Sequence, residues 1–144
     1  MSRRKKAFTN FEENKNIAKL LILFRIWDNK SQTQIAKAIG VSFQQIQKYE
    51  KCLNRISAEN LLTICKKRNW KIELFMAKAK DIFGYRMVIH RDQKEYSERI
   101  KKINKLWNEL DIIGEDNYYN NCNPRAKELI RISKEKRKIN AWNI

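Results

Sequence analysis

Apolar residues recur at intervals of three and four along residues 14–29, which predicts a helix with a buried stripe. The stripe consists of Ile17, Leu20, Leu21, Phe24 and Trp27. Three further apolar positions, Ile22, Leu23 and Ile26, broaden it. We therefore expect part of this helix to face a partner or the C-terminal region as well as its own domain.

Two short helices joined by a tight turn are predicted next, at residues 32–39 and 43–50. Ser31 and Ser42 precede them as N-caps, and each is followed three residues later by a glutamine that can reach back to the cap. Gly40 can adopt the positive φ that ends the first of these helices. The two helix starts are thus specified by local sequence.

Two more helices are expected before residue 84. Ser57 caps one that runs to about Arg68, and the other covers residues 72–82. The side chains expected to face inward are Leu61, Leu62, Ile64 and Cys65 in the first, and Ile72, Phe75, Met76, Ala79 and Ile82 in the second. Trp70 and Phe75 are expected to complete the core.

Gly84 is the expected boundary of the C-terminal region. Residues 85–90 alternate in polarity, which predicts either a short strand that pairs with its mate in a dimer or a linker. A long helix is expected over residues 91–110, then a polar loop over residues 111–123 and a basic helix from Pro124. The apolar face of the long helix comprises Tyr96, Ile100, Ile103, Leu106, Trp107 and Leu110.

Residues 15–80 resemble the lambda repressor and Cro family of helix-turn-helix proteins, also called the xenobiotic-response-element family. The matching residues are Ser31-Gln32, Ile35-Ala36, Ile39 to Ser42, Phe43 to Glu50, Asn54 to Ser57, Leu61-Leu62 and Ile64. The resemblance implies an all-α fold: a five-helix DNA-binding domain followed by a C-terminal helical extension. We divide the chain into a basic N-terminal arm (1–13), that domain (14–83) and a dimerisation or regulatory region (84–144).

The resemblance places the second motif helix, Phe43–Glu50, in the DNA major groove. The residues expected to read bases are Phe43, Gln44, Gln47 and Lys48. A glutamine amide can pair with N6 and N7 of adenine, which makes Gln44 the main candidate. Phe43 either touches a thymine methyl group or packs on Val41 or on the first helix, and Lys48 can contact a guanine or a phosphate.

Phosphate contacts are expected beside the reading helix. The resemblance implies them for Gln32, Ser42, Asn54 and Arg55. Cys52 stands where the family usually has glycine, and a non-glycine residue at positive φ costs about 1 kcal/mol.

The charge favours a polyanionic partner. The 144 residues carry a formal net charge of +16, and residues 1–82 hold 18 Lys and Arg against 7 Asp and Glu. Glu50 is acidic within this basic stretch, so we expect it to pair with Arg25 on the first helix. The basic run Arg3–Lys6 is either a solvated tail or an arm that contacts DNA.

Neither a cofactor nor a metal site is expected. The chain has three cysteines in no CxxC pair and one histidine, His90, and no catalytic constellation is apparent. Free thiols suit a reducing compartment. No transmembrane run or signal peptide is expected, which favours a cytoplasmic, nucleoid-associated protein.

The leading hypothesis is a transcriptional regulator, most simply a repressor that binds a two-fold operator on double-stranded DNA as a homodimer. The alternative is a DNA-binding antitoxin whose C-terminal helices, within residues 84–144, grip a partner protein. An enzyme is disfavoured.

Overall fold

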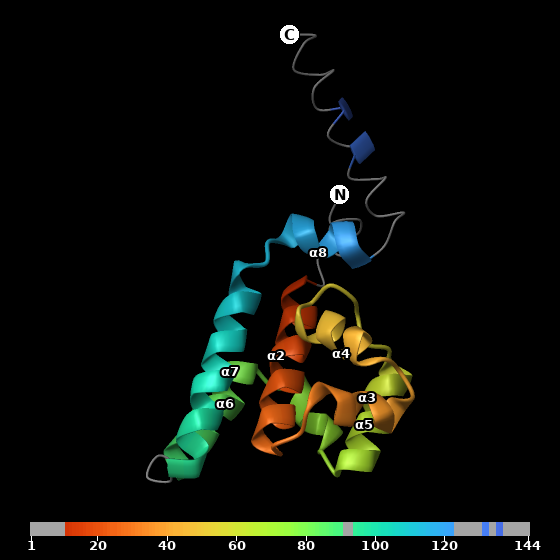
Figure 1. Ribbon diagram of the computed structural model, residues 1–144. Helices are drawn as coiled ribbons and strands as arrows, with labels where there is room; N and C mark the ends of the chain where they lie inside the picture. The colour runs from red at the N-terminus through yellow and green to blue at the C-terminus, as the bar shows by residue number, and fades with distance from the viewer. Residues whose placement is uncertain (1–10, 91–93, 123–130, 133–134, 137–144) are drawn as a thin grey trace.

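The computed structural model describes residues 11–90, 94–122, 131–132 and 135–136 (Figure 1). All elements in these ranges are helices and none is a strand, so the predicted all-α class is confirmed. The elements are α2 Phe11–Trp27, α3 Gln32–Ile39, α4 Phe43–Glu50, α5 Ala58–Arg68, the 3₁₀ helix η1 Ile72–Met76, α6 Ala79–His90, α7 Lys94–Ile112 and α8 Glu115–Cys122.

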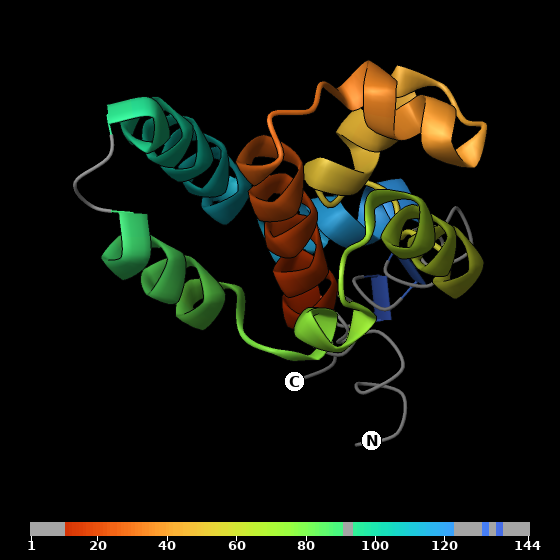
Figure 2. The ribbon, with the colours of Figure 1, turned by 90° about the horizontal axis from the view of Figure 1, so that it is seen from below.

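Helix α2 lies at the centre of the molecule, with α6 and α7 on one side and α3, α4 and α5 on the other (Figure 2). Every side chain from Leu20 to Trp27 is buried, so this part of the helix is covered around its whole circumference. The broad apolar stripe is thereby explained. One side of α2 packs on α4, and the other packs on α6 and α7.

Helix α2 begins at Phe11, three residues before its predicted start. Phe11 is buried, and Glu12 and Glu13 lie in the first turn, where carboxylates are stabilised by the helix dipole. Phe11–Glu13, which we had assigned to the N-terminal arm, is therefore helical. Residues 1–10, with the basic run, lie outside the described residues.

The prediction of one continuous helix over residues 72–82 is wrong. The structure has two helices there, because η1 ends at Met76 and α6 begins at Ala79. The Asn16 side chain holds the break between them. Its Nδ2 donates to the carbonyl oxygen of Ala77 (2.8 Å), and its Oδ1 accepts from the amide of Ala79 (2.8 Å). This contact between distant segments satisfies backbone groups at the start of α6.

Trp70 and Phe75 complete the core beside Phe24 of α2, as expected. Both are buried, and their rings lie 5.5 Å and 5.2 Å from the ring of Phe24. Two side chains expected in the core are instead exposed: Leu62 on α5 and Met76 at the end of η1.

Helix α6 continues through Gly84, so the strand or linker expected for residues 85–90 is wrong. The alternating pattern is too short to distinguish a period of two from a helix with one buried side. The helix buries Ala79 and Phe83 and exposes Tyr85.

The C-terminal region also differs from expectation. Helix α7 covers residues 94–112 and so ends two residues later than expected, residues 91–93 lie outside the described ranges, and the polar loop expected over residues 111–123 contains α8. Gly114 separates the two helices, Glu115 and Asp116 occupy the first turn of α8, and Tyr118 is fully buried. Of the basic helix expected from Pro124, only residues 131–132 and 135–136 are described, and they are helical.

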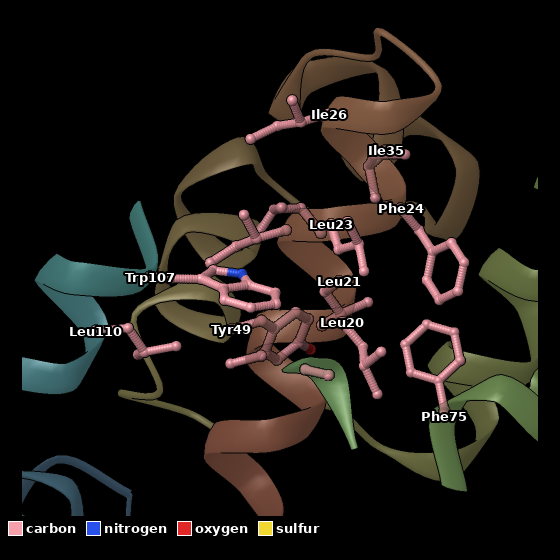
Figure 3. Packing of buried hydrophobic residues seen from close by; sticks show 14 of the residues in the cluster. Leu20, Leu21, Leu23, Phe24, Ile26, Ile35, Tyr49, Phe75, Trp107 and Leu110 are labelled. Atoms are coloured by element: carbon pink, nitrogen blue, oxygen red, sulfur yellow. The ribbon is translucent and has the colours of Figure 1, made fainter. Parts of the chain in front are cut away.

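Helix α7 shares one hydrophobic core with α2, α3 and α4. Ile103, Trp107 and Leu110 belong to the same buried cluster as the residues of α2 (Figure 3). The Trp107 Nε1–H donates to the carbonyl oxygen of Lys19 at 3.1 Å. The described part of the C-terminal region is thus bound to the motif through α2.

Salt bridges also link α7 to α2. Asp111 Oδ1 lies 3.0 Å from Lys15 Nζ and 2.8 Å from Lys19 Nζ. Partial burial alone would raise the pKa of Asp111, but hydrogen bonds and attraction from Lys19 and Lys15 outweigh it and lower that pKa. Asp111 is therefore charged at neutral pH.

Candidate nucleic-acid interface

Helix α4 has one buried face and one exposed face. Ile46, Tyr49 and Glu50 are buried against the rest of the motif. On the other side Gln44 and Lys48 are exposed and Gln47 is half-buried. The polar candidates for base reading therefore point away from the core.

Phe43, the fourth candidate, begins α4 and is 43% exposed. Val41, on which it was alternatively expected to pack, is partly buried against the core. The phenyl ring thus keeps a large apolar surface in contact with solvent, next to the polar candidates of α4.

Local caps fix where α3 and α4 begin. Ser31 Oγ accepts from the amide of Gln34 (3.1 Å), and the Gln34 side chain accepts from the amide of Ser31 (2.8 Å). Ser42 Oγ accepts from the amide of Gln45 (3.2 Å). Gly40 has a φ of 67° at the end of α3, so the turn uses the backbone freedom of glycine.

The buried ion pair between Arg25 and Glu50 ties α4 to α2, as expected. Arg25 Nε and Nη2 donate to the two carboxylate oxygens of Glu50, each at 2.7 Å. Both residues are 5% exposed. Arg25 Nη1 also donates to the carbonyl oxygen of Lys30 (3.0 Å), next to the start of α3. One guanidinium thus links α2, the following loop and α4.

Gln32, a predicted phosphate ligand, is oriented by the same carboxylate. Its Nε2 donates to Glu50 Oε1 at 3.3 Å from the first position of α3. The side chain is therefore held at the amino end of this helix, where backbone N–H groups are available to an anion.

Asn54 and Arg55, the other predicted phosphate ligands, lie in the loop after α4. The amides of Leu53 and Asn54 donate to the carbonyl oxygen of Lys48 (2.8 and 3.3 Å), which folds the loop back onto the helix. Arg55 is exposed, and its Nε donates to Tyr118 Oη of α8 (2.9 Å).

Sequence reasoning missed Tyr118, because it treated the segment around this residue as a loop. The available signal was Glu115 and Asp116 after Gly114, which is typical of a helix start.

The Cys52 backbone has the positive φ that glycine usually provides. Its φ is 58° and its side chain is 1% exposed. The cysteine thus lies in the left-handed region, where a non-glycine residue is strained.

Replacing Cys52 by glycine and by alanine should separate backbone strain from side-chain packing. Both variants lose the thiol, but only glycine relieves the left-handed conformation. We expect Cys52→Gly to be more stable than Cys52→Ala by about 0.5–1 kcal/mol, the reverse of the order inside a helix. Urea denaturation measures the difference. Equal stability, or a more stable alanine variant, would show that φ is not the limiting factor.

In the described ranges, no group of three or more His, Cys, Asp or Glu side chains could hold a metal ion. Burial, with a smaller effect of Glu73, raises the pKa of Cys65 to about 11, so this thiol is protonated at neutral pH. No helix in the same ranges is both long and apolar enough to cross a membrane.

Comparisons with known proteins give matches over only part of the chain. A helix-turn-helix family model matches residues 21–67. A protein of Sinorhizobium fredii called uncharacterized HTH-type transcriptional regulator y4wC is 57% identical over 42 residues, 29% of each chain. One of Rhodospirillum rubrum, called uncharacterized transcriptional regulator in ATPase CF(0) region, is 52% identical over 46 residues, 32% of this chain and 43% of the relative.

The aligned part of this chain thus spans less than half the length of either relative. No solved structure gives a significant match. The family match covers the helices that carry the two capped starts, Gly40 and the exposed face of α4. Residues 21–67 therefore form a helix-turn-helix of the lambda repressor and Cro type.

Proposed function

We propose that this protein is a sequence-specific, double-stranded DNA-binding transcription regulator that acts as a repressor by occupying its operator. The observation that carries the proposal is the exposed face of α4, where Gln44 and Lys48 project from a helix whose other face is buried. The printed names of the relatives, transcriptional regulators, support the same function. A cytoplasmic, nucleoid-associated location follows from it.

Base reading would use the exposed face of α4. In the major groove, the Gln44 amide can donate to N7 or accept from N6 of adenine, and Lys48 can donate to O6 or N7 of guanine. Gln47 lies between them along the helix. The exposed ring of Phe43 suits a thymine methyl group.

Phosphate contacts would hold α4 in the groove. Gln32 lies at the amino end of α3, and the Ser42 hydroxyl, while accepting from Gln45, still has its proton to donate to a phosphate oxygen. Asn54 and Arg55 would grip a second phosphate from the loop after α4. Such contacts position the helix without reading sequence.

A homodimer would explain how so short a reading helix could recognise a complete operator. Two copies related by a two-fold axis would place their α4 helices in successive major grooves, about 10 base pairs apart. The region from Gly84 onward is our candidate for dimerisation or regulation.

An antitoxin that binds both DNA and a partner protein is the second candidate. The C-terminal half of α6 supports it, because Tyr85, Val88 and Ile89 are all more than half exposed and lie at helical spacing. Co-purification of a small toxin from cells that express both proteins would favour this candidate. Recovery of this chain alone would count against it.

Gln44→Ala tests the proposed readout. We expect the variant to fold normally and to lose discrimination at a single base pair of the operator, at a cost of about 1–3 kcal/mol. The measurement compares its Kd for the preferred duplex with its Kd for duplexes that carry each single-base change.

Asn104→Ala is the matched control, since it removes an exposed amide from α7. It should leave affinity and discrimination unchanged. If Gln44→Ala weakened binding equally on all sequences, Gln44 would not read a base.

A further inference from the structure

We propose that Tyr118 of α8 is a positioning residue for DNA binding and that it acts by orienting Arg55 toward a phosphate. The inference rests on the proposed function, and it extends the DNA-binding machinery to a helix outside the residues matched by the family model. The observation that carries it is the hydrogen bond from Arg55 Nε to Tyr118 Oη, 2.9 Å long and spanning 63 residues of sequence.

The tyrosine is well anchored. Its side chain is 0% exposed, and its ring centroid lies 5.2 Å from that of Phe11 at the start of α2. The phenol therefore has a fixed position relative to the core, and its hydroxyl accepts a hydrogen bond from the loop that follows α4. A buried aromatic body with a polar tip is suited to holding a mobile partner.

The arginine, in contrast, is exposed. Among the described residues its guanidinium makes one hydrogen bond, through Nε. That leaves Nη1 and Nη2, which form one edge of the planar group, for a phosphate oxygen pair. Tyr118 thus binds the Nε edge of the guanidinium, in a side chain that as a whole is exposed.

Orientation matters because a free arginine side chain loses much rotamer entropy when it binds. A side chain already held in its binding geometry avoids part of that loss, which appears as higher affinity. The effect should be independent of base sequence, because Arg55 would contact only the backbone.

The test is a double-mutant cycle of Tyr118→Phe and Arg55→Lys in the full chain. Binding to a labelled duplex of mixed sequence is measured by fluorescence anisotropy over a range of salt concentrations. We expect Tyr118→Phe to raise Kd by about 3- to 10-fold, since the ring is retained and only the oriented hydroxyl is lost. The salt dependence should stay the same, because the number of phosphate contacts is unchanged.

Arg55→Lys keeps the charge and removes the planar group that reaches the hydroxyl and a phosphate together. In this background, Tyr118→Phe should have almost no further effect on Kd. Thr63→Val is the matched control, because it removes a hydroxyl that donates to the Glu59 carbonyl oxygen within α5, and it should bind like the wild type. Melting temperatures show whether each variant is folded.

The outcomes are distinct. Loss of affinity that appears only with Arg55 present supports the proposal. Wild-type affinity in Tyr118→Phe, or the same loss in both backgrounds, overturns it and leaves the proposed regulator intact. A wild-type protein that fails to bind duplex DNA even at low salt overturns both.

Discussion

Glu50→Ala is expected to lower the free energy of unfolding by about 3–5 kcal/mol, because it leaves the Arg25 guanidinium buried without a counterion. Both partners are 5% exposed, so solvent cannot replace the lost carboxylate without a rearrangement of the core. The same substitution frees Gln32, which donates to Glu50 Oε1. DNA affinity should therefore fall even under conditions where the variant is still folded. Chemical denaturation and Kd measurements test the two effects separately.

The double variant Arg25→Met, Glu50→Leu provides the control for this result. Replacing both charges by apolar side chains of similar size avoids an unpaired buried charge, so it should be far less destabilising than Glu50→Ala alone. It should nevertheless bind DNA weakly, since Gln32 again lacks its partner. If Glu50→Ala cost less than about 1 kcal/mol, the pair would behave as a solvated surface ion pair, contrary to the structure.

Trp107→Ala is expected to cost about 3–5 kcal/mol, the usual range for removing a large aromatic side chain from a core. The Trp107 ring lies 4.8 Å from the Phe83 ring, and Lys19 Nζ lies 5.3 Å from its centroid. Because α7 and α2 share one core, the whole motif should unfold in one transition at a lower denaturant concentration.

Leu62→Ala is the comparison for Trp107→Ala. Leu62 is 48% exposed on α5, so its truncation should change stability by about 0.5 kcal/mol or less. If Trp107→Ala were as mild as Leu62→Ala, or if it shifted a separate transition and left the motif unaffected, α7 would not be part of the core.

The sequence predicted α3 and α4 with their observed bounds because the signals for these helices are local. A serine cap before each helix, the glutamine that completes the cap of α3, and a glycine at the turn act within one helical turn of their own positions. The Arg25–Glu50 pair was also predictable, since an isolated acid in a basic motif requires a cation nearby.

The elements after residue 70 were less predictable because distant contacts determine them. The break before α6 depends on Asn16, which is 63 residues from Ala79. Gly84 is tolerated inside α6, so its presence did not mark a helix end. Helix α8 owes its position to the burial of Tyr118 against Phe11, which no periodicity in a short polar segment indicates.

The candidate interface likewise has one part that local sequence predicts and another that depends on distant contacts. Its exposed polar face on α4 follows from the helix period, whereas the orientation of Gln32 by Glu50 and of Arg55 by Tyr118 required the fold.

The most direct test of the proposed function is selection of bound duplexes from a random DNA pool at about physiological salt, where non-specific binding is weak. We predict enrichment of an inverted repeat whose half-sites lie about 10 base pairs apart, as expected for a dimer that reads DNA with α4. No enriched sequence, despite binding at low salt, would contradict sequence-specific regulation and leave only a basic surface that binds polyanions.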